Sequence, residues 1–518
     1  MLAAVRSAAV LGIDAYEITV EVDAALGLPQ WTLVGLPAGA VKESRERVSS
    51  ALLNSGFTVP ARRITVNLAP ADVRKEGTAF DLPIALGILV CTGQLAADSL
   101  RALVVVGELG LDGSVRAIRG ALPVARMVAE VGQDTLVLPL ANVAEASLVS
   151  AARLSAPQTL GQLVGELRSG LLSSPGINSL PSARVSDSVD FSDVTGQEPA
   201  KRALEVAAAG SHNVLLVGPP GAGKTMLARR LPSILPPLSE RESLEVTAIH
   251  SVAGLLMAES PVVSERPFRA PHHSISDAGL IGGGNPPRPG EVSLAHLGIL
   301  FLDELLEFRR HVVESLRQPM EDGRVAVARA AITLVFPARF TLVAATNPCP
   351  CGHAGDTLRS CCCAAGDIVK YRSRLSGPLA DRIDLHVRTG RVAIHRMACG
   401  RDGESSSQVR ERVSAAREMQ RVRYRVLPGM SCNAHAPGRW LHTHGGLDNA
   451  ARNLLGRASE RLGVTARGYH RIMRVARTIA DLDESVAVSS LHVAEALRYR
   501  PAVADSSVGI SLSTAAQQ

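Results

Sequence analysis

Hydrophobic residues change their spacing several times along the first 168 residues, and these changes predict alternating strands and helices. Short runs of strand-like sequence predict strands at 18–22, 32–35, 63–68, 103–107 and 135–139. Longer runs with helical spacing predict helices at 40–55, 82–93 and 120–131. Residues 1–168 are therefore expected to form an α+β or α/β domain.

The rest of the chain divides into four regions by the same criterion. Residues 169–188 are rich in Ser, Pro and Gly and lack an apolar period, which predicts a linker. Apolar strand patterns that alternate with helical ones over 189–395 predict an α/β core. Helical periodicity in 396–502 predicts a small lid domain, and the polar residues 503–518 predict a flexible tail.

One stretch of the core fits the phosphate-binding pattern G-x-x-x-x-G-K-[ST] at every position. It consists of Gly218-Pro219-Pro220-Gly221-Ala222-Gly223-Lys224-Thr225. A strand pattern at 213–217 precedes it and a helical pattern at 226–231 follows it, which makes an ordinary glycine-rich turn the weaker interpretation. Backbone N–H groups of such a loop surround the phosphates, Lys224 reaches the β- and γ-phosphates, and Thr225 holds Mg²⁺. The sequence therefore predicts a nucleoside triphosphate site.

Two later strand patterns end in side chains that suit the same chemistry. The apolar run 298–302 ends at Asp303, which is expected to hold Mg²⁺, and at Glu304, which is expected to orient or deprotonate the attacking water. The alternative is a buried strand that ends in solvated acids. The run 340–345 leads to Asn347, whose amide suits a hydrogen bond to the γ-phosphate or its water. A turn-forming Asn before proline is the alternative there.

Five of the eight cysteines lie between residues 349 and 363, a clustering that favours metal binding over disulfides. Two C-x-C arms supply enough thiolates for a closed, structural Zn²⁺ site: Cys349, Cys351, Cys361 and Cys363. Free thiols on a loop are the alternative, and Cys362 is expected to take no part. His272 and His273 lack an acidic or cysteine neighbour at ligand spacing and are expected to be structural.

Bulk properties limit the partners and the location. A net charge of +6 and a pI near 9.0 permit a polyanionic partner, while 3% aromatic residues argue against nucleic-acid recognition by stacked rings. No signal peptide is evident, and the apolar run 84–91 is too short to span a bilayer. A cytoplasmic protein without a membrane partner is expected.

Two segments of the first domain, 80–85 and 107–116, resemble the Lon-type proteolytic domain, which has a ribosomal-protein-like fold. The resemblance implies a Ser–Lys peptidase. By alignment, however, Ile84 occupies the position of the nucleophile and Val124 that of the lysine. We therefore expect no proteolysis from this domain, because both the hydroxyl and its base are missing. Partner binding or assembly is the expected role.

Three features narrow the family. These are an arginine-bearing insert at 266–274 with glycines at 282–284, a hairpin pattern at 323–338, and the sequence Asn347-Pro348-Cys349-Pro350-Cys351-Gly352. Together they closely resemble the magnesium-chelatase-like AAA+ proteins of the YifB/ComM competence family over nearly the whole chain. The resemblance implies a ring-forming ATPase, expected to be a homohexamer that uses ATP and Mg²⁺. It further implies a branch-migration helicase that acts on single-stranded or branched DNA, with recombination proteins as partners. The alternative is a chelatase-type motor subunit that remodels a protein.

The resemblance also assigns roles to arginines. It implies that Arg382 reaches the γ-phosphate of a neighbouring subunit, with a salt bridge to Asp381 or Asp384 as the alternative. It places Arg467 at the sensor-2 position, where the lid contacts nucleotide, although Arg471 lies one turn away.

Four arginines on the inserts are expected to contact the DNA backbone: Arg266, Arg269, Arg324 and Arg329. Solvated or subunit-interface faces are the alternative for all of them. The charged helical pattern at 404–425 faces either DNA or water.

Overall fold

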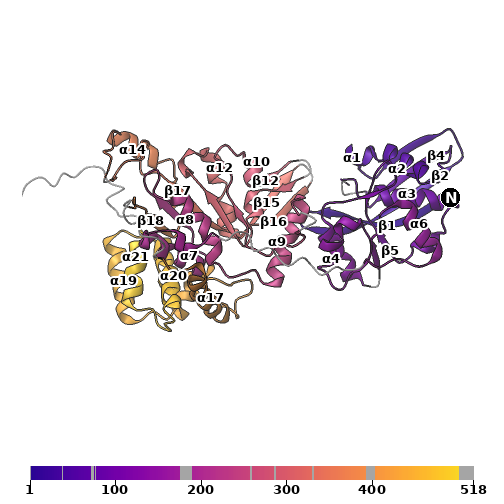
Figure 1. Ribbon diagram of the computed structural model, residues 1–518. Coiled ribbons are helices and arrows are strands. Elements are labelled where there is room, and N and C mark those ends of the chain that lie inside the picture. The colour runs from indigo at the N-terminus through magenta and orange to yellow at the C-terminus, as the bar shows by residue number, and fades with distance from the viewer. Residues whose placement is uncertain are drawn as a thin grey trace, which may run out of the picture.

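The computed structural model describes residues 2–37, 39–71, 75, 77–132, 134–175, 189–256, 260–284, 287–329, 332–356, 358–392 and 403–500. The N-terminal α/β region lies at one end, the sheet that carries the phosphate loop lies in the middle, and the C-terminal helices cover the other end (Figure 1). Residues 176–188 of the predicted linker and the predicted tail at 503–518 lie outside the described residues. Among the described helices, none is both long and apolar enough to cross a lipid bilayer.

The N-terminal region contains a four-stranded sheet in the order β1-β2-β4-β3, a three-stranded parallel sheet in the order β5-β8-β9, and a short pair, β6-β7. The strands are β1 (Leu2–Leu11), β2 (Asp14–Ala25), β3 (Gln30–Val34), β4 (Arg63–Ala69), β5 (Leu103–Val105), β6 (Glu108–Leu109), β7 (Val115–Arg116), β8 (Thr135–Val137) and β9 (Arg153–Ser155). The helices are α1 (Gly39–Lys42), α2 (Ser44–Asn54), α3 (Asp81–Cys91), α4 (Ala121–Val131), α5 (Val143–Ala146) and α6 (Leu160–Ser169).

Helix α3 is buried along its whole length because it is apolar on nearly every face. All the strands and helices predicted for this region are present, although the helix expected at 40–55 is divided into α1 and α2. Strand β1 was not predicted, because its alanine-rich sequence has weak strand propensity. Antiparallel pairing with β2, from Leu2 opposite Asp23 to Leu11 opposite Asp14, overrides that weak local preference.

The middle region is built on a five-stranded parallel sheet in the order β11-β14-β17-β10-β18. Its strands are β11 (Phe268–Arg269), β14 (Ile299–Leu302), β17 (Thr341–Thr346), β10 (Val214–Val217) and β18 (Leu385–Arg388). The sheet confirms the three predicted core strands, all of which are buried. One expectation is wrong: Phe268 and Arg269 do not belong to an insert but form the edge strand of this sheet, paired with β14.

Further helices and two short antiparallel pairs surround the sheet. The helices are α7 (Glu198–Gly210), α8 (Lys224–Arg230), α9 (Glu240–Ala253), α10 (Asp277–Leu280), α11 (Glu291–Leu294), α12 (Arg310–Glu314), α13 (Arg317–Asp322), α14 (Ala365–Arg372) and α15 (Gly377–Ala380). The glycines near 282 form β12 (Gly282–Gly283), which pairs with β13 (Arg288–Pro289). The predicted hairpin is confirmed as β15 (Arg324–Arg329) and β16 (Ile332–Pro337).

The C-terminal region is helical, as its periodicity predicts. Its helices are α17 (Ser406–Arg423), α18 (Gly438–His444), α19 (Asn449–Arg461), α20 (Ala466–Leu482) and α21 (Ser490–Arg498). Helices α17 and α20 pack against α7, so that one hydrophobic cluster runs from the sheet through α7 into the C-terminal helices. This region is therefore docked on the core by a continuous apolar contact (Figure 1).

The N-terminal region contacts the core through α4, which packs against α9. The carboxylate of Glu145 accepts hydrogen bonds from the hydroxyl of Ser251 on α9 and from the backbone N–H of Leu122. Burial raises the pKa of Glu145. Leu11 and Ile13, at the turn between β1 and β2, pack on the hydrophobic cluster that contains the hairpin β15–β16.

A buried ionic cluster holds the C-terminal helices together. The carboxylate of Asp481 on α20 is fully buried and accepts hydrogen bonds from Arg423, Arg477 and Asn433. We expect Asp481→Ala to lower the free energy of unfolding by about 3–5 kcal/mol, because the buried Arg477 and the partly buried Arg423 lose their counter-charge. Urea denaturation followed by circular dichroism measures this change. Glu418→Ala, which removes the partner of the exposed Arg421, is the matched control and should leave stability unchanged. Equal stability of the two variants would contradict the assignment.

Candidate active site

Three loops meet at one edge of the parallel sheet, because β10, β14 and β17 all end there. The phosphate loop follows β10, Asp303 and Glu304 follow β14, and Asn347 follows β17. Strand β17 lies between the other two strands, so Asn347 is placed between the phosphate loop and the acidic pair. The structure thus brings together the residues that the sequence predicts for nucleotide chemistry.

The phosphate loop has the backbone that its glycines permit. Gly221 and Gly223 both have a φ of +77°, a conformation that favours glycine. Gly218 packs so closely on the strand end of β18 that an added Cβ would lie 2.2 Å from the hydroxyl of Thr389. Helix α8 begins at Lys224, so its unpaired N–H groups and its dipole point toward the loop.

Lys224 reaches back over the loop. Its Nζ donates hydrogen bonds to the carbonyl oxygens of Gly218 at 2.6 Å and Pro219 at 3.0 Å, and to Oδ1 of Asn347 at 3.1 Å. Burial lowers the pKa of Lys224, and the nearby carboxylates of Asp303 and Glu304 oppose that shift. An anionic phosphate is a stronger partner for this ammonium group than two carbonyls and an amide.

The two predicted Mg²⁺ ligands are in contact. The hydroxyl of Thr225 donates a hydrogen bond to Oδ2 of Asp303 at 2.7 Å, although 78 residues separate them. The other carboxylate oxygen of Asp303 accepts the backbone N–H of Glu304 at 3.0 Å. A hydroxyl and a carboxylate at this separation form a donor set that Mg²⁺ accepts.

Glu304 has a φ of +52°, which is uncommon for a residue with a side chain. Such strain concentrates at functional sites. The carboxylate is exposed and lies 4.0 Å from Nδ1 of His273. The sequence did not predict this contact, because it depends on β11 lying beside β14 with both strands ending at the same edge.

Gln197 is a further residue at the site. Its side-chain Nε2 donates hydrogen bonds to the carbonyl oxygen of Ala222, in the phosphate loop, and to that of Gly390, after β18. Only tertiary structure reveals this bridge, because the three residues come from distant parts of the chain.

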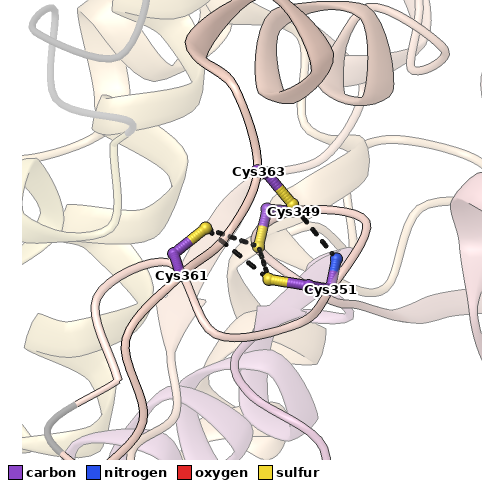
Figure 2. Close-up of side chains that lie close together, drawn as sticks. All are labelled: Cys349, Cys351, Cys361 and Cys363. Carbon is purple, nitrogen blue, oxygen red and sulfur yellow. Dashed lines mark hydrogen bonds between the residues drawn. The ribbon is translucent and has the colours of Figure 1, made fainter.

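The four predicted cysteines converge into one cluster (Figure 2). The Sγ atom of Cys349 lies 3.4 Å from that of Cys351 and 3.6 Å from that of Cys361, and the last two are 3.6 Å apart. The backbone N–H of Cys351 donates to Sγ of Cys363 at 3.4 Å. These sulfurs are too far apart for disulfides, whose S–S bond is about 2.05 Å. They suit a tetrahedral thiolate site, where a Zn–S bond of about 2.3 Å requires sulfur separations of about 3.8 Å.

The thiols of the cluster differ in their pKa values. Backbone N–H groups, first that of His353 and then that of Cys362, lower the pKa of Cys351 to about 5. At Cys361 and Cys363, a backbone hydrogen bond lowers the pKa but is outweighed by burial and by hydrogen bonds with neighbouring thiols, so both pKa values are raised. A thiolate is the form that binds metal. Cys362 itself is exposed and its sulfur is not part of the cluster, as predicted.

The two arginines assigned to nucleotide contacts lie elsewhere in this chain. Arg382 donates to the carbonyl oxygen of Pro378 at 2.6 Å and forms an ion pair with Glu321, so neither Asp381 nor Asp384 is its partner. Arg467 is exposed at the start of α20.

Arg471, the alternative to Arg467, pairs with a carboxylate at the other end of the sheet. It lies 3.8 Å from Asp384, which precedes β18, whereas the phosphate loop follows β10. The role of Arg382 and Arg467 toward a neighbouring subunit stays a prediction.

Two of the four insert arginines are used inside the protein, so the prediction that they face DNA is wrong for them. Arg266 is buried and donates to the carbonyl oxygens of Pro236 and Leu297. Arg269 forms a bidentate pair with Glu291 at 2.7 and 2.8 Å. Arg324 is exposed on β15, and the side chain of Arg329 lies outside the described residues.

The arginine-rich helix α17 mostly serves docking. Arg410 and Arg417 donate to the carbonyl oxygens of Ser233 and Ala208 in the core. Arg412 pairs with Glu205 of α7 at 2.7 Å. Most of these arginine side chains therefore contact the protein core, rather than DNA or water alone.

Comparison with known proteins identifies the family. Residues 190–397 match the family model "Magnesium chelatase, subunit ChlI", residues 403–500 match its C-terminal model, and residues 20–142 match "Subunit ChlI of Mg-chelatase". The chain is 44% identical to the competence protein ComM of Haemophilus influenzae over 97% of this chain and 98% of that protein. It is 42% identical to the uncharacterized protein YifB of Escherichia coli over 96% and 97%.

The 67 kDa magnesium-chelatase subunit of Heliobacterium mobile is 30% identical over 41% of this chain and 32% of that protein. Similarity to ComM and YifB thus covers nearly the full length, whereas similarity to this chelatase subunit covers less than half. The chain belongs to the YifB/ComM family of magnesium-chelatase-like proteins.

Proposed function

We propose that the chain is an ATP-hydrolysing AAA+ motor that acts on DNA, as a helicase that promotes branch migration during recombination of incoming DNA. The observation that carries the ATPase part is the contact of Lys224 with Asn347 and of Thr225 with Asp303 at one sheet edge. Full-length similarity to a protein named for competence supports the DNA part.

In this proposal, each residue at the carboxyl ends of the strands has its own role in hydrolysis. The loop N–H groups and Lys224 bind the β- and γ-phosphates. Thr225 and Asp303 are the ligands for Mg²⁺, which supplies charge neutralisation at those phosphates. Glu304 orients the attacking water or accepts its proton, and Asn347 donates a hydrogen bond to the γ-phosphate or that water.

The motor is proposed to work as a cytoplasmic ring, with a homohexamer as the expected assembly. In a ring, Arg382 would leave Glu321 and reach the γ-phosphate of the adjacent subunit, where an arginine stabilises charge in the transition state. Arg467 is free to contact nucleotide across the same interface, because it is exposed. We propose that the N-terminal region is a Lon-like domain without protease activity, and that the region 396–502 serves as the lid.

The alternative is a chelatase-type motor that remodels a protein partner. The family models carry the name of magnesium chelatase, which favours this alternative in general terms. Similarity to the chelatase subunit covers only 41% of this chain and 32% of that subunit, which argues against the chelatase alternative. The two functions differ in the partner that stimulates ATP hydrolysis.

We expect ATP hydrolysis by the wild-type chain to rise several-fold with single-stranded or branched DNA. Phosphate release measured over a salt series provides the readout, and the stimulation should weaken as salt increases because phosphate contacts release counterions. Lys224→Ala should reduce hydrolysis to background with and without DNA. Lys370→Ala, which changes an exposed lysine on α14, is the matched control and should hydrolyse ATP normally. Stimulation by a protein and by no DNA would exclude the helicase.

We also propose that the four-cysteine cluster holds a structural Zn²⁺ ion. Four thiolates close the coordination sphere, so the ion would stabilise the loop and would not activate water.

Purified protein should contain about one zinc ion per chain by elemental mass spectrometry. Cys349→Ser should remove most of this zinc, because a buried ligand is lost, whereas Cys362→Ser should retain it. Less than about one zinc per two chains in the wild type would refute the site.

A further inference from the structure

The cysteine cluster lies against the active site. An added Cβ on Gly352, which follows Cys351, would lie 2.6 Å from Cδ of Pro220 in the phosphate loop and 3.9 Å from Cγ of Asn347. The turn between the two halves of the cluster therefore packs directly on the phosphate loop and on the side chain of Asn347. We propose that the metal held by this cluster positions Asn347 for hydrolysis, so that hydrolysis depends on the metal and nucleotide binding does not. This proposal rests on the proposed ATPase function.

The first connection is through the backbone. Asn347 is two residues from Cys349, which is fully buried, and the intervening residue is proline, whose φ is fixed by its ring. Oδ1 of Asn347 accepts the hydrogen bond from Lys224 at 3.1 Å. A movement of Cys349 therefore also displaces Asn347, because the backbone between them has little conformational freedom.

The second connection is through the other arm. Cys361 and Cys363 precede α14, and Arg372 at the end of that helix donates to the carbonyl oxygen of Pro348 at 3.1 Å. The cluster thus ties α14 to the segment that leaves β17. This helix leads to the Arg382 segment, which is proposed to serve the neighbouring subunit.

A third connection joins the cysteine segment to the residues that follow β18. Between the two arms, Asp356 forms ion pairs with His353 at 3.1 Å and with Arg391 at 3.3 Å. Arg391 directly follows Gly390, whose carbonyl accepts from Gln197 at the phosphate loop. The cysteine loop therefore contacts the exits of both β17 and β18, on either side of the phosphate loop.

A bound metal ion would hold the residues of these three connections in fixed positions. Thiols at 3.4–3.6 Å interact only weakly with each other, while a metal joins all four by strong bonds. Without it, the closure of the segment from 349 to 363 is opposed by chain entropy. Phosphates are bound mainly by the loop N–H groups and Lys224, which do not belong to the cysteine segment. Asn347 acts on the γ-phosphate or the water, so its displacement affects the transition state more than binding.

The test uses the full-length protein and the arm remote from Asn347. Cys361→Ser and Cys363→Ser should lose zinc and lower kcat for ATP by about tenfold or more, because small misplacements of positioning groups have large effects. The Kd for Mg²⁺–ATP, measured with a slowly hydrolysed analogue, should change by less than about threefold. Cys362→Ser, the neighbouring exposed cysteine, should behave as wild type. Cys361→His, which restores a zinc ligand, should recover both zinc and kcat.

A second experiment leaves the thiols intact. Zinc removed from the wild-type chain by a zinc-selective chelator should lower kcat while the Kd for Mg²⁺–ATP is retained, and this measurement decides the question if the serine variants do not fold, as judged by circular dichroism. Gly352→Ala places a methyl group against Pro220 of the phosphate loop, so it should instead impair both kcat and nucleotide binding while zinc is retained.

Wild-type kcat in a zinc-free serine variant, or in the wild-type chain after zinc removal, would overturn the proposal. An equal loss of affinity and of kcat would overturn the division between binding and hydrolysis. All assays are run with and without DNA, so absence of wild-type hydrolysis under both conditions would instead reject the ATPase function itself.

Discussion

The register of β17 between its two neighbours is the constraint on which the active site depends. Val217 at the end of β10 lies opposite Thr346, while Leu302 at the end of β14 lies opposite Ala344. Strand β17 therefore extends past β14 and delivers Asn347 beside the phosphate loop. The N–H of Gly218 donates to the carbonyl of Thr346 at 3.2 Å, which fixes this level. A slip of one residue would turn each side chain to the other face of the sheet and remove the Lys224–Asn347 contact.

Local features were predictable from the sequence because each is written in a short segment. The phosphate loop, the acidic pair after β14 and the two cysteine arms combine residue type with an adjacent strand pattern, and the structure brings them together. Strand β1 and the edge strand β11 escaped prediction, because the first is alanine-rich and the second has only two residues. The contacts of Gln197 and His273 could not be predicted, since their partners come from loops that only the sheet order brings together.

The arginines illustrate the limit of arguing from charge. Position on an insert suggested a DNA-facing role for Arg266 and Arg269, yet one satisfies buried carbonyls and the other pairs with Glu291. A buried backbone carbonyl left without a donor costs free energy, so a long cationic side chain that donates to it stabilises the fold. Among the four insert arginines, Arg324 on the hairpin is the one with a described side chain that stays exposed for the proposed DNA contact.

The strained backbone of Glu304 also determines how the side chains of the site are arranged. Its left-handed backbone costs about 1–3 kcal/mol, and the surrounding sheet must supply that free energy. The same conformation lets its N–H donate to Asp303, whose second oxygen receives Thr225. It also leaves the carboxylate exposed at the sheet edge, where a water must enter. The conformation that destabilises one residue thus orients the proposed Mg²⁺ ligands and keeps the proposed base accessible, while Asn347 lies beside them at the end of the neighbouring strand.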